Sequence, residues 1–107
     1  MKLGDNYSVY GFMTRELGLK GAELQVFALI YSFTRATGEF SGSRSYIATR
    51  VGITERTVDR AMRELVLRGL VERLERRDGN RLRSYITIPK RAPAYIGELM
   101  QDTRSVG

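Results

Sequence analysis

The stretch that decides the fold runs from Tyr46 to Val71 and reads YIATRVGITERTVDRAMRELVLRGLV. In a helix-turn-helix the two helices approach so closely that the inner position on the first must be small, and the turn needs a residue that accepts a positive φ. Ala48 and Gly52 occupy these two places. The apolar positions that lock such a unit together are filled by Ile47, Val51, Ile53, Val58 and Ala61. The stretch therefore predicts a helix-turn-helix.

Capping residues predict where the two helices of this unit begin and end. Ser43 can cap a short helix that continues to about Arg50, and Thr54 can cap a longer one from Glu55 to Arg68. Gly69 follows at a position that commonly ends a helix. The apolar residues of the longer helix recur at i, i+3, i+4 and i+7, namely Val58, Ala61, Met62 and Leu65. We expect this helix to bury one face and expose a charged one.

After Gly69 the hydrophobic period changes from that of a helix to that of a strand. The run that begins with Leu70 and the run Arg81–Ile88 flank Asp78-Gly79-Asn80, so we expect a hairpin that Pro89 ends. Its tip is rich in arginine: Arg76, Arg77, Arg81 and Arg83. Strand alternation predicts Arg81 and Arg83 on one face, and Arg76 on the face opposite Arg77.

The flanking segments give weaker predictions. Residues 6–13 read as a short strand or as an extended arm, and Ala22–Ala36, stopped by Gly38, reads as the central helix. A brief strand is possible at Phe40, and Ala94–Asp102 can form a short final helix. The residues that an N-terminal arm would lay on the core are Tyr7, Val9 and Phe12.

Composition excludes several classes of function. The 107 residues suit a single domain and include no cysteine or histidine, so disulfides, thiolate or imidazole metal sites and Ser/His or Cys/His catalysis are excluded. No phosphate-cradling glycine loop or paired carboxylate indicates an enzyme, and we expect no cofactor, metal or small-molecule ligand. Without an apolar leader or a stretch long enough to span a membrane, the chain reads as cytoplasmic.

The positive charge is concentrated in one half of the chain. The net charge is +6, yet residues 44–91 alone hold 13 basic and 6 acidic side chains. Most of these cations are arginine, whose forked guanidinium suits phosphate and guanine. Double-stranded DNA is therefore the expected partner. The candidate contacts are Ser43, Arg44, Thr54, Glu55, Arg56, Thr57, Arg60, Arg63, Arg76, Arg77, Asn80, Arg81 and Arg83.

Individual charges on the helix 55–68 leave alternatives open. Arg56 and Arg60 lie one turn apart and suit either a guanine edge or a phosphate, whereas Glu55 suits either cytosine N4 or the helix dipole. The i, i+4 spacing also predicts two ordinary surface pairs, Asp59 with Arg63 and Glu64 with Arg68. The hairpin arginines can likewise serve only to keep its edges soluble.

The chain resembles winged-helix-turn-helix DNA-binding domains over about Tyr7 to Ile88. The bacterial domains it looks most similar to occur in plasmid and phage replication initiators, replisome organisers and small regulators. The residues that match their pattern are Tyr46, Ala48, Gly52, Ile53, Thr54, Arg56, Thr57, Val58, Arg60, Ala61, Leu65, Gly69, Leu70 and Val71. Replication initiators of this kind are normally longer, so the chain is either a stand-alone regulator or a piece of a larger protein.

This resemblance implies an α+β, mostly α, winged helix-turn-helix: a three-helix core, a β-hairpin wing and a short C-terminal helix. It divides the chain into an N-terminal arm (1–19), a winged-helix domain (20–89) and a C-terminal helix and tail (90–107). It implies sequence-specific DNA binding through a recognition helix at about 54–68 and a wing at 75–83, in replication initiation or transcriptional regulation. The alternative is a protein–protein interaction module. The C-terminal helix packs either on the body or on a second subunit, as a homodimer.

Overall fold

The centre of the fold is helix α2 (Gly21–Thr37), in a computed structural model that describes residues 7–95. The helix predicted over Ala22–Ala36 is confirmed, with one further residue at each end. Its middle turns are buried on every side, from Val26 to Tyr31, because the other elements pack around it. A helix that is apolar all round is stable only in such surroundings.

Two further helices follow α2 and pack against it and each other. They are α3 (Arg44–Val51) and α4 (Glu55–Leu67), close to the predicted bounds. The predicted caps are confirmed: the Ser43 side chain accepts a hydrogen bond from Tyr46 N at 3.1 Å, and the Thr54 side chain accepts one from Thr57 N at 3.1 Å. These bonds satisfy amide donors that the first turn of a helix otherwise leaves unpaired.

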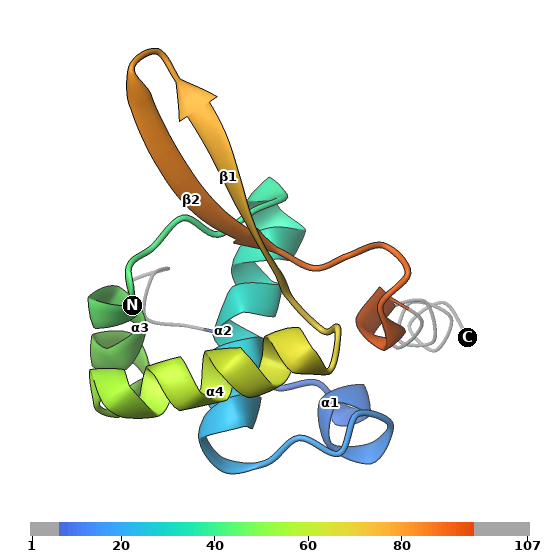
Figure 1. The fold of residues 1–107 in the computed structure, drawn as a ribbon. Helices are drawn as coiled ribbons and strands as arrows, with labels where there is room; N and C mark the ends of the chain where they lie inside the picture. The colour runs from blue at the N-terminus through green and yellow to red at the C-terminus, as the bar shows by residue number, and fades with distance from the viewer. Residues whose placement is uncertain (1–6, 96–107) are drawn as a thin grey trace.

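Strands β1 (Glu72–Asp78) and β2 (Arg81–Thr87) form an antiparallel hairpin, as the change of period predicted. Asp78 pairs with Arg81, so the loop consists of Gly79 and Asn80. Gly79 has a φ of +67° and Asn80 does not have a positive φ, which is the pattern of a type II′ turn. The hairpin projects beyond the helices (Figure 1). The brief strand considered at Phe40 is present as a bridge to Ile86.

The N-terminal segment differs from its prediction. Helix α1 (Gly11–Arg15) stands where a strand or an extended arm was expected, and residues 7–10 before it have no regular structure. A helical turn lets the consecutive side chains Phe12 and Met13 both reach the core, whereas a strand would point them to opposite faces. Val9, expected on the core, is 47% exposed.

The C-terminal helix falls mostly outside the described residues. Residues 93–95 are helical at the point where the description ends, and Ala94 is buried while Tyr95 packs at the edge of the core. The dimer contact predicted through residues 94–102 therefore lies for the most part outside the described chain. Within residues 7–95, no helix combines the length and apolar character needed to cross a membrane.

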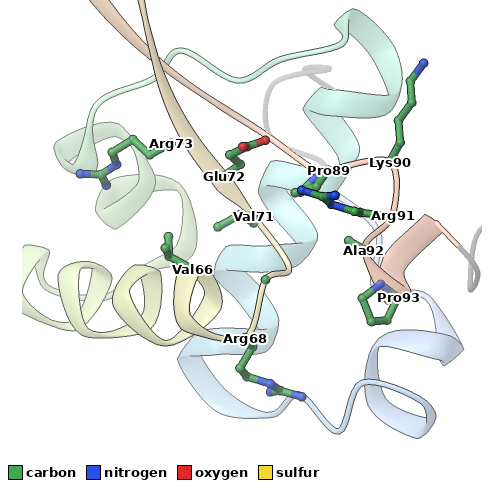
Figure 2. A pocket seen from close by; sticks show the side chains of 11 residues that line it. Val66, Arg68, Val71, Glu72, Arg73, Pro89, Lys90, Arg91, Ala92 and Pro93 are labelled. Atoms are coloured by element: carbon green, nitrogen blue, oxygen red, sulfur yellow. The ribbon is translucent and has the colours of Figure 1, made fainter.

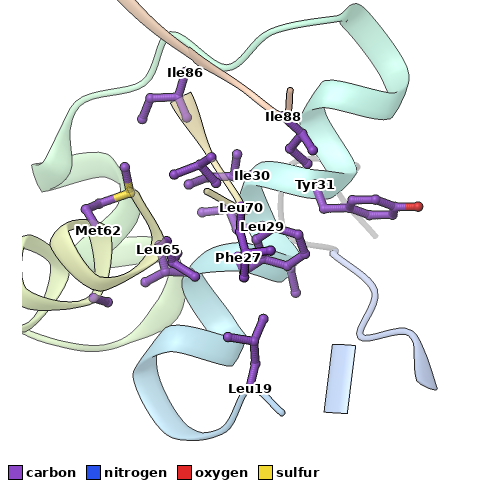
Figure 3. Packing of buried hydrophobic residues seen from close by; sticks show 14 of the residues in the cluster. Leu19, Phe27, Leu29, Ile30, Tyr31, Met62, Leu65, Leu70, Ile86 and Ile88 are labelled. Carbon is purple, nitrogen blue, oxygen red and sulfur yellow. The ribbon is translucent and has the colours of Figure 1, made fainter. Parts of the chain in front are cut away.

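One hydrophobic core joins these elements into a small, mostly helical α+β domain with a two-stranded hairpin. Phe27 and Ile30 of α2 pack with Met62 and Leu65 of α4, and Ile86 closes the core from β2 (Figure 3). Tyr31 stacks edge-on against Phe12, with ring centroids 5.4 Å apart, so α1 joins the same core. This arrangement is compatible with the winged-helix architecture expected from the sequence.

Candidate nucleic-acid interface

The corner between α3 and α4 is fixed by backbone hydrogen bonds. Gly52 has a φ of +86°, in the left-handed region, and its N–H donates to Ala48 O at 2.8 Å. The next amide, of Ile53, donates to the same oxygen at 3.0 Å. Ala48 is buried, as expected for the small inner residue of this corner. The corner therefore sets the direction in which α4 leaves α3.

The exposed face of α4 carries a row of arginines. Val58, Ala61, Met62 and Leu65 are buried, as predicted. The opposite side of the helix presents Arg56, Arg60 and Arg63, all of them exposed. These three follow one another at i, i+4 and i+7, the spacing of a single helix face. None of the three forms an ion pair with a carboxylate of residues 7–95.

Arg44 joins the first turn of α3 to the first turns of α4. Its Nη1 lies 2.6 Å from Oδ2 of Asp59, and its Nε lies 3.3 Å from Oε1 of Glu55. Asp59 thus pairs with Arg44 rather than with Arg63, which corrects the prediction made from the i, i+4 spacing. The arginine predicted as a DNA contact is therefore engaged by two carboxylates of its own chain.

Arg68, at the end of α4, is held by Leu17, which precedes α2, and by Glu23 in the first turn of α2. Its Nη2 donates to the carbonyl oxygen of Leu17, and its Nη1 lies 4.0 Å from Oε1 of Glu23. The predicted pair of Glu64 with Arg68 is therefore wrong, because a partner distant in sequence displaces the one on the same helix. Arg68 helps to fix α4 on the body of the domain.

Arg76, on the hairpin, is bonded to the loop that follows α2. Its guanidinium makes two hydrogen bonds to Glu39, at 3.2 and 3.0 Å, and lies 4.8 Å from the centroid of the Tyr85 ring. The hydrogen bond and charge of Glu39 raise the pKa of Arg76 above its ordinary value. Arg76 thus positions the hairpin against the loop that follows α2.

The remaining tip arginines are exposed: Arg77, Arg81 and Arg83. Arg76 is the Cα partner of Arg83, so Arg76, Arg81 and Arg83 share one face of the hairpin and Arg77 lies on the other, as alternation predicted. Within the described chain, none of the three exposed arginines has an ion-pair partner. The tip thus presents cations on both faces, with Asn80 exposed between them.

A groove of about 460 Å³ links α4 to the base of the hairpin. It is lined by Arg44, Asp59, Met62, Arg63, Val66, Leu67 and Arg73. Arg73, on β1, was not among the predicted contacts, although strand alternation places it on the same face as Arg77. Strand alternation could therefore have identified Arg73 from the sequence. The predicted sites on α4 and on the hairpin are thus connected by a further arginine.

A second, larger depression of about 830 Å³ lies between the end of α4, the start of β1 and residues 89–93. Its lining includes Val66, Val71, Arg73 and Ala92, which Figure 2 shows. Its lining includes one carboxylate, that of Glu72, and no hydroxyl group.

No family model matches the chain, and no curated protein matches it significantly. The candidate interface consists of the exposed row on α4, the exposed cations of the hairpin tip and the groove that joins them. The predicted site residues fall into two groups. The exposed arginines and Asn80 can meet a ligand. The residues engaged within the chain are Ser43, Arg44, Thr54, Glu55, Thr57 and Arg76.

Proposed function

We propose that this domain is a winged helix-turn-helix that binds double-stranded DNA sequence-specifically, with α4 in the major groove. The observation that carries the proposal is the row Arg56, Arg60 and Arg63. These three arginines are exposed on one face of a helix and have no carboxylate partner in residues 7–95. An α-helix fits the major groove, where arginine forks onto guanine O6 and N7.

The hairpin is the wing in this proposal. Arg77, Arg81 and Arg83 would lie against a neighbouring groove or its phosphates, and Arg73 would continue the contact from the groove beside α4. Arg76 acts differently, because its guanidinium is already bonded to Glu39. Its part is to hold the wing at a fixed angle to the helices.

The resemblance seen in the sequence supports a role in plasmid or mobile-element replication initiation, or in transcriptional regulation. A homodimer formed through residues 94–102 would read two half-sites about one helical turn apart. A selected site with two-fold symmetry would indicate that dimer, whereas a single short motif would indicate a monomer.

The second candidate function is a protein–protein interaction module. It is favoured by Leu67, which is 75% exposed on α4, and by the neighbouring Val66, which is 43% exposed. Both line the groove that also contains Arg63 and Arg73. An acidic protein with an apolar anchor would fit that combination of charge and apolar surface.

Binding to random duplex DNA over a range of salt concentrations separates the two candidates. A DNA-binding winged helix should bind a labelled random duplex at low salt, with log K falling linearly against log salt by about 0.9 for each phosphate neutralised. Fluorescence anisotropy measures this directly. A protein-interaction module would show no binding to the duplex at low salt, and that result would reject the proposed function.

A further inference from the structure

Arg44, Glu55 and Asp59 form a charged cluster that lies beside the arginine row of the proposed DNA interface. Glu55 and Asp59 lie one turn apart on α4 and flank the start of the arginine row. All three side chains of the cluster are partly exposed, at 57% for Arg44, 49% for Glu55 and 40% for Asp59. Uncompensated carboxylates here would repel phosphate and weaken binding.

Arg44 is the cation that compensates both carboxylates within residues 7–95, since no other arginine or lysine there lies within 4.0 Å of either. Its 2.6 Å bond to Asp59 is short, as expected for a charge-assisted hydrogen bond. Two of the nitrogens of its guanidinium, Nε and Nη1, are directed at these carboxylates. These two contacts tie the guanidinium to α4.

The contact between Arg44 and Asp59 also determines whether Arg63 has a carboxylate partner. Asp59 and Arg63 have the i, i+4 spacing at which surface ion pairs form on a helix. In the structure Asp59 forms its ion pair with Arg44 instead, and Arg63 has no carboxylate partner in residues 7–95. Arg44 thus keeps one member of the arginine row available.

We infer that Arg44 is a positioning residue for DNA binding: it neutralises Glu55 and Asp59 and so keeps Arg63 free for phosphate or base, without contacting DNA itself. The inference rests on the proposed function. It assigns Arg44 a different part from the direct contact that its charge and position in the sequence predicted.

Three variants test this inference against random duplex DNA, each with its affinity and salt dependence measured. R44A should bind about fivefold more weakly than the wild type, because two carboxylates are uncovered and Asp59 captures Arg63. R44A/D59N should recover the wild-type affinity to within about twofold and the wild-type slope of log K against log salt. R44A/E64Q is the matched control, because Glu64 is an exposed carboxylate of α4 outside the cluster; it should stay weak.

Several outcomes would overturn the inference. A slope that stays lower by about 0.9 in R44A/D59N would make Arg44 a phosphate contact. If R44A/E64Q recovers as much affinity as R44A/D59N, the loss in R44A reflects net charge and not the contact with Asp59. If R44A binds as tightly as the wild type, Arg44 has no positioning role. Absence of wild-type binding would reject the proposed function and this inference together. Circular dichroism melts of every variant verify folding, and R44Q replaces R44A if the alanine variant does not fold.

Discussion

The guanidinium of Arg76 lies 3.0 Å from the carboxylate of Glu39, and this pair joins the hairpin to the loop after α2. The two residues are 37 positions apart in the sequence, so the contact is made only when the hairpin has docked. Thr87, at the base of the hairpin, also donates to the carbonyl oxygen of Gly38 at 3.1 Å. The hairpin is therefore held to the loop after α2 at two points, one near its tip and one at its base.

Arg76 and its neighbour Arg77 should differ in their effect on DNA binding. Arg77→Ala should lower the slope of log K against log salt by about 0.9, the value for one phosphate that the variant no longer neutralises. Arg76→Ala should leave that slope unchanged, because its charge is already bonded to Glu39. Titrations of a random duplex with each variant measure both slopes. Equal decreases in slope would show that Arg76 also leaves Glu39 for a phosphate.

Replacing Arg77 and Arg81 together should weaken binding to all sequences alike. The expected decrease in the salt slope is about 1.8, twice the value for one phosphate. The matched control is Arg15→Ala with Lys20→Ala, which removes the same charge at exposed positions, one in α1 and one immediately before α2. Filter binding or anisotropy on specific and random duplexes provides the comparison. Wild-type binding by the hairpin variant would exclude the hairpin as a DNA contact.

The sequence was most informative where local signals agree with the tertiary structure. The caps Ser43 and Thr54, the glycine at position 52 and the turn at Gly79 each depend on a few neighbouring residues, and their elements were predicted within one or two positions. Helix α1 was missed because five residues do not form a helix alone. It is held by the burial of Phe12 and Met13 against the core.

The candidate site was only partly predictable for a related reason. The spacing rule for ion pairs considers one helix at a time, so it paired Asp59 with Arg63 and not with Arg44, 15 positions away on another helix. The exposed arginines of α4 followed from the amphipathic pattern. The amphipathic pattern could not predict that these arginines lack carboxylate partners, because this depends on which other side chains the fold brings near them.

Gly52→Ala should destabilise the domain by about 1–2 kcal/mol, because a residue with a Cβ atom is strained at its φ of +86°. Apart from Gly52 itself and its two neighbours in the chain, no heavy atom lies within 4 Å of the added Cβ, so backbone strain is the expected cause. Thermal unfolding should show the melting temperature lowered by about 4–8 °C for each kcal/mol. The control Thr49→Ala, at an exposed position of α3, should have little effect. An unchanged melting temperature for Gly52→Ala would mean that the corner tolerates a different backbone.

Arg56→Ala should weaken binding to a specific site more than binding to random DNA. The expected difference is about 1–3 kcal/mol, the range for a bidentate arginine–guanine contact. Arg15→Ala, on α1, is the single-charge control and should affect neither. Competition titrations with specific and random duplexes measure the difference. If Arg56→Ala weakens both kinds of binding equally, Arg56 contacts phosphate and not a base.

Selection of bound duplexes from a random pool tests the central claim most directly, since that claim is sequence-specific binding through α4. The wild-type protein should enrich a defined motif, and Arg56→Ala should enrich a motif without the wild-type preference at one base pair or more. Both proteins should still retain salt-sensitive binding to the unselected pool. If repeated rounds with the wild-type protein enrich no motif, α4 does not read sequence and the account is contradicted.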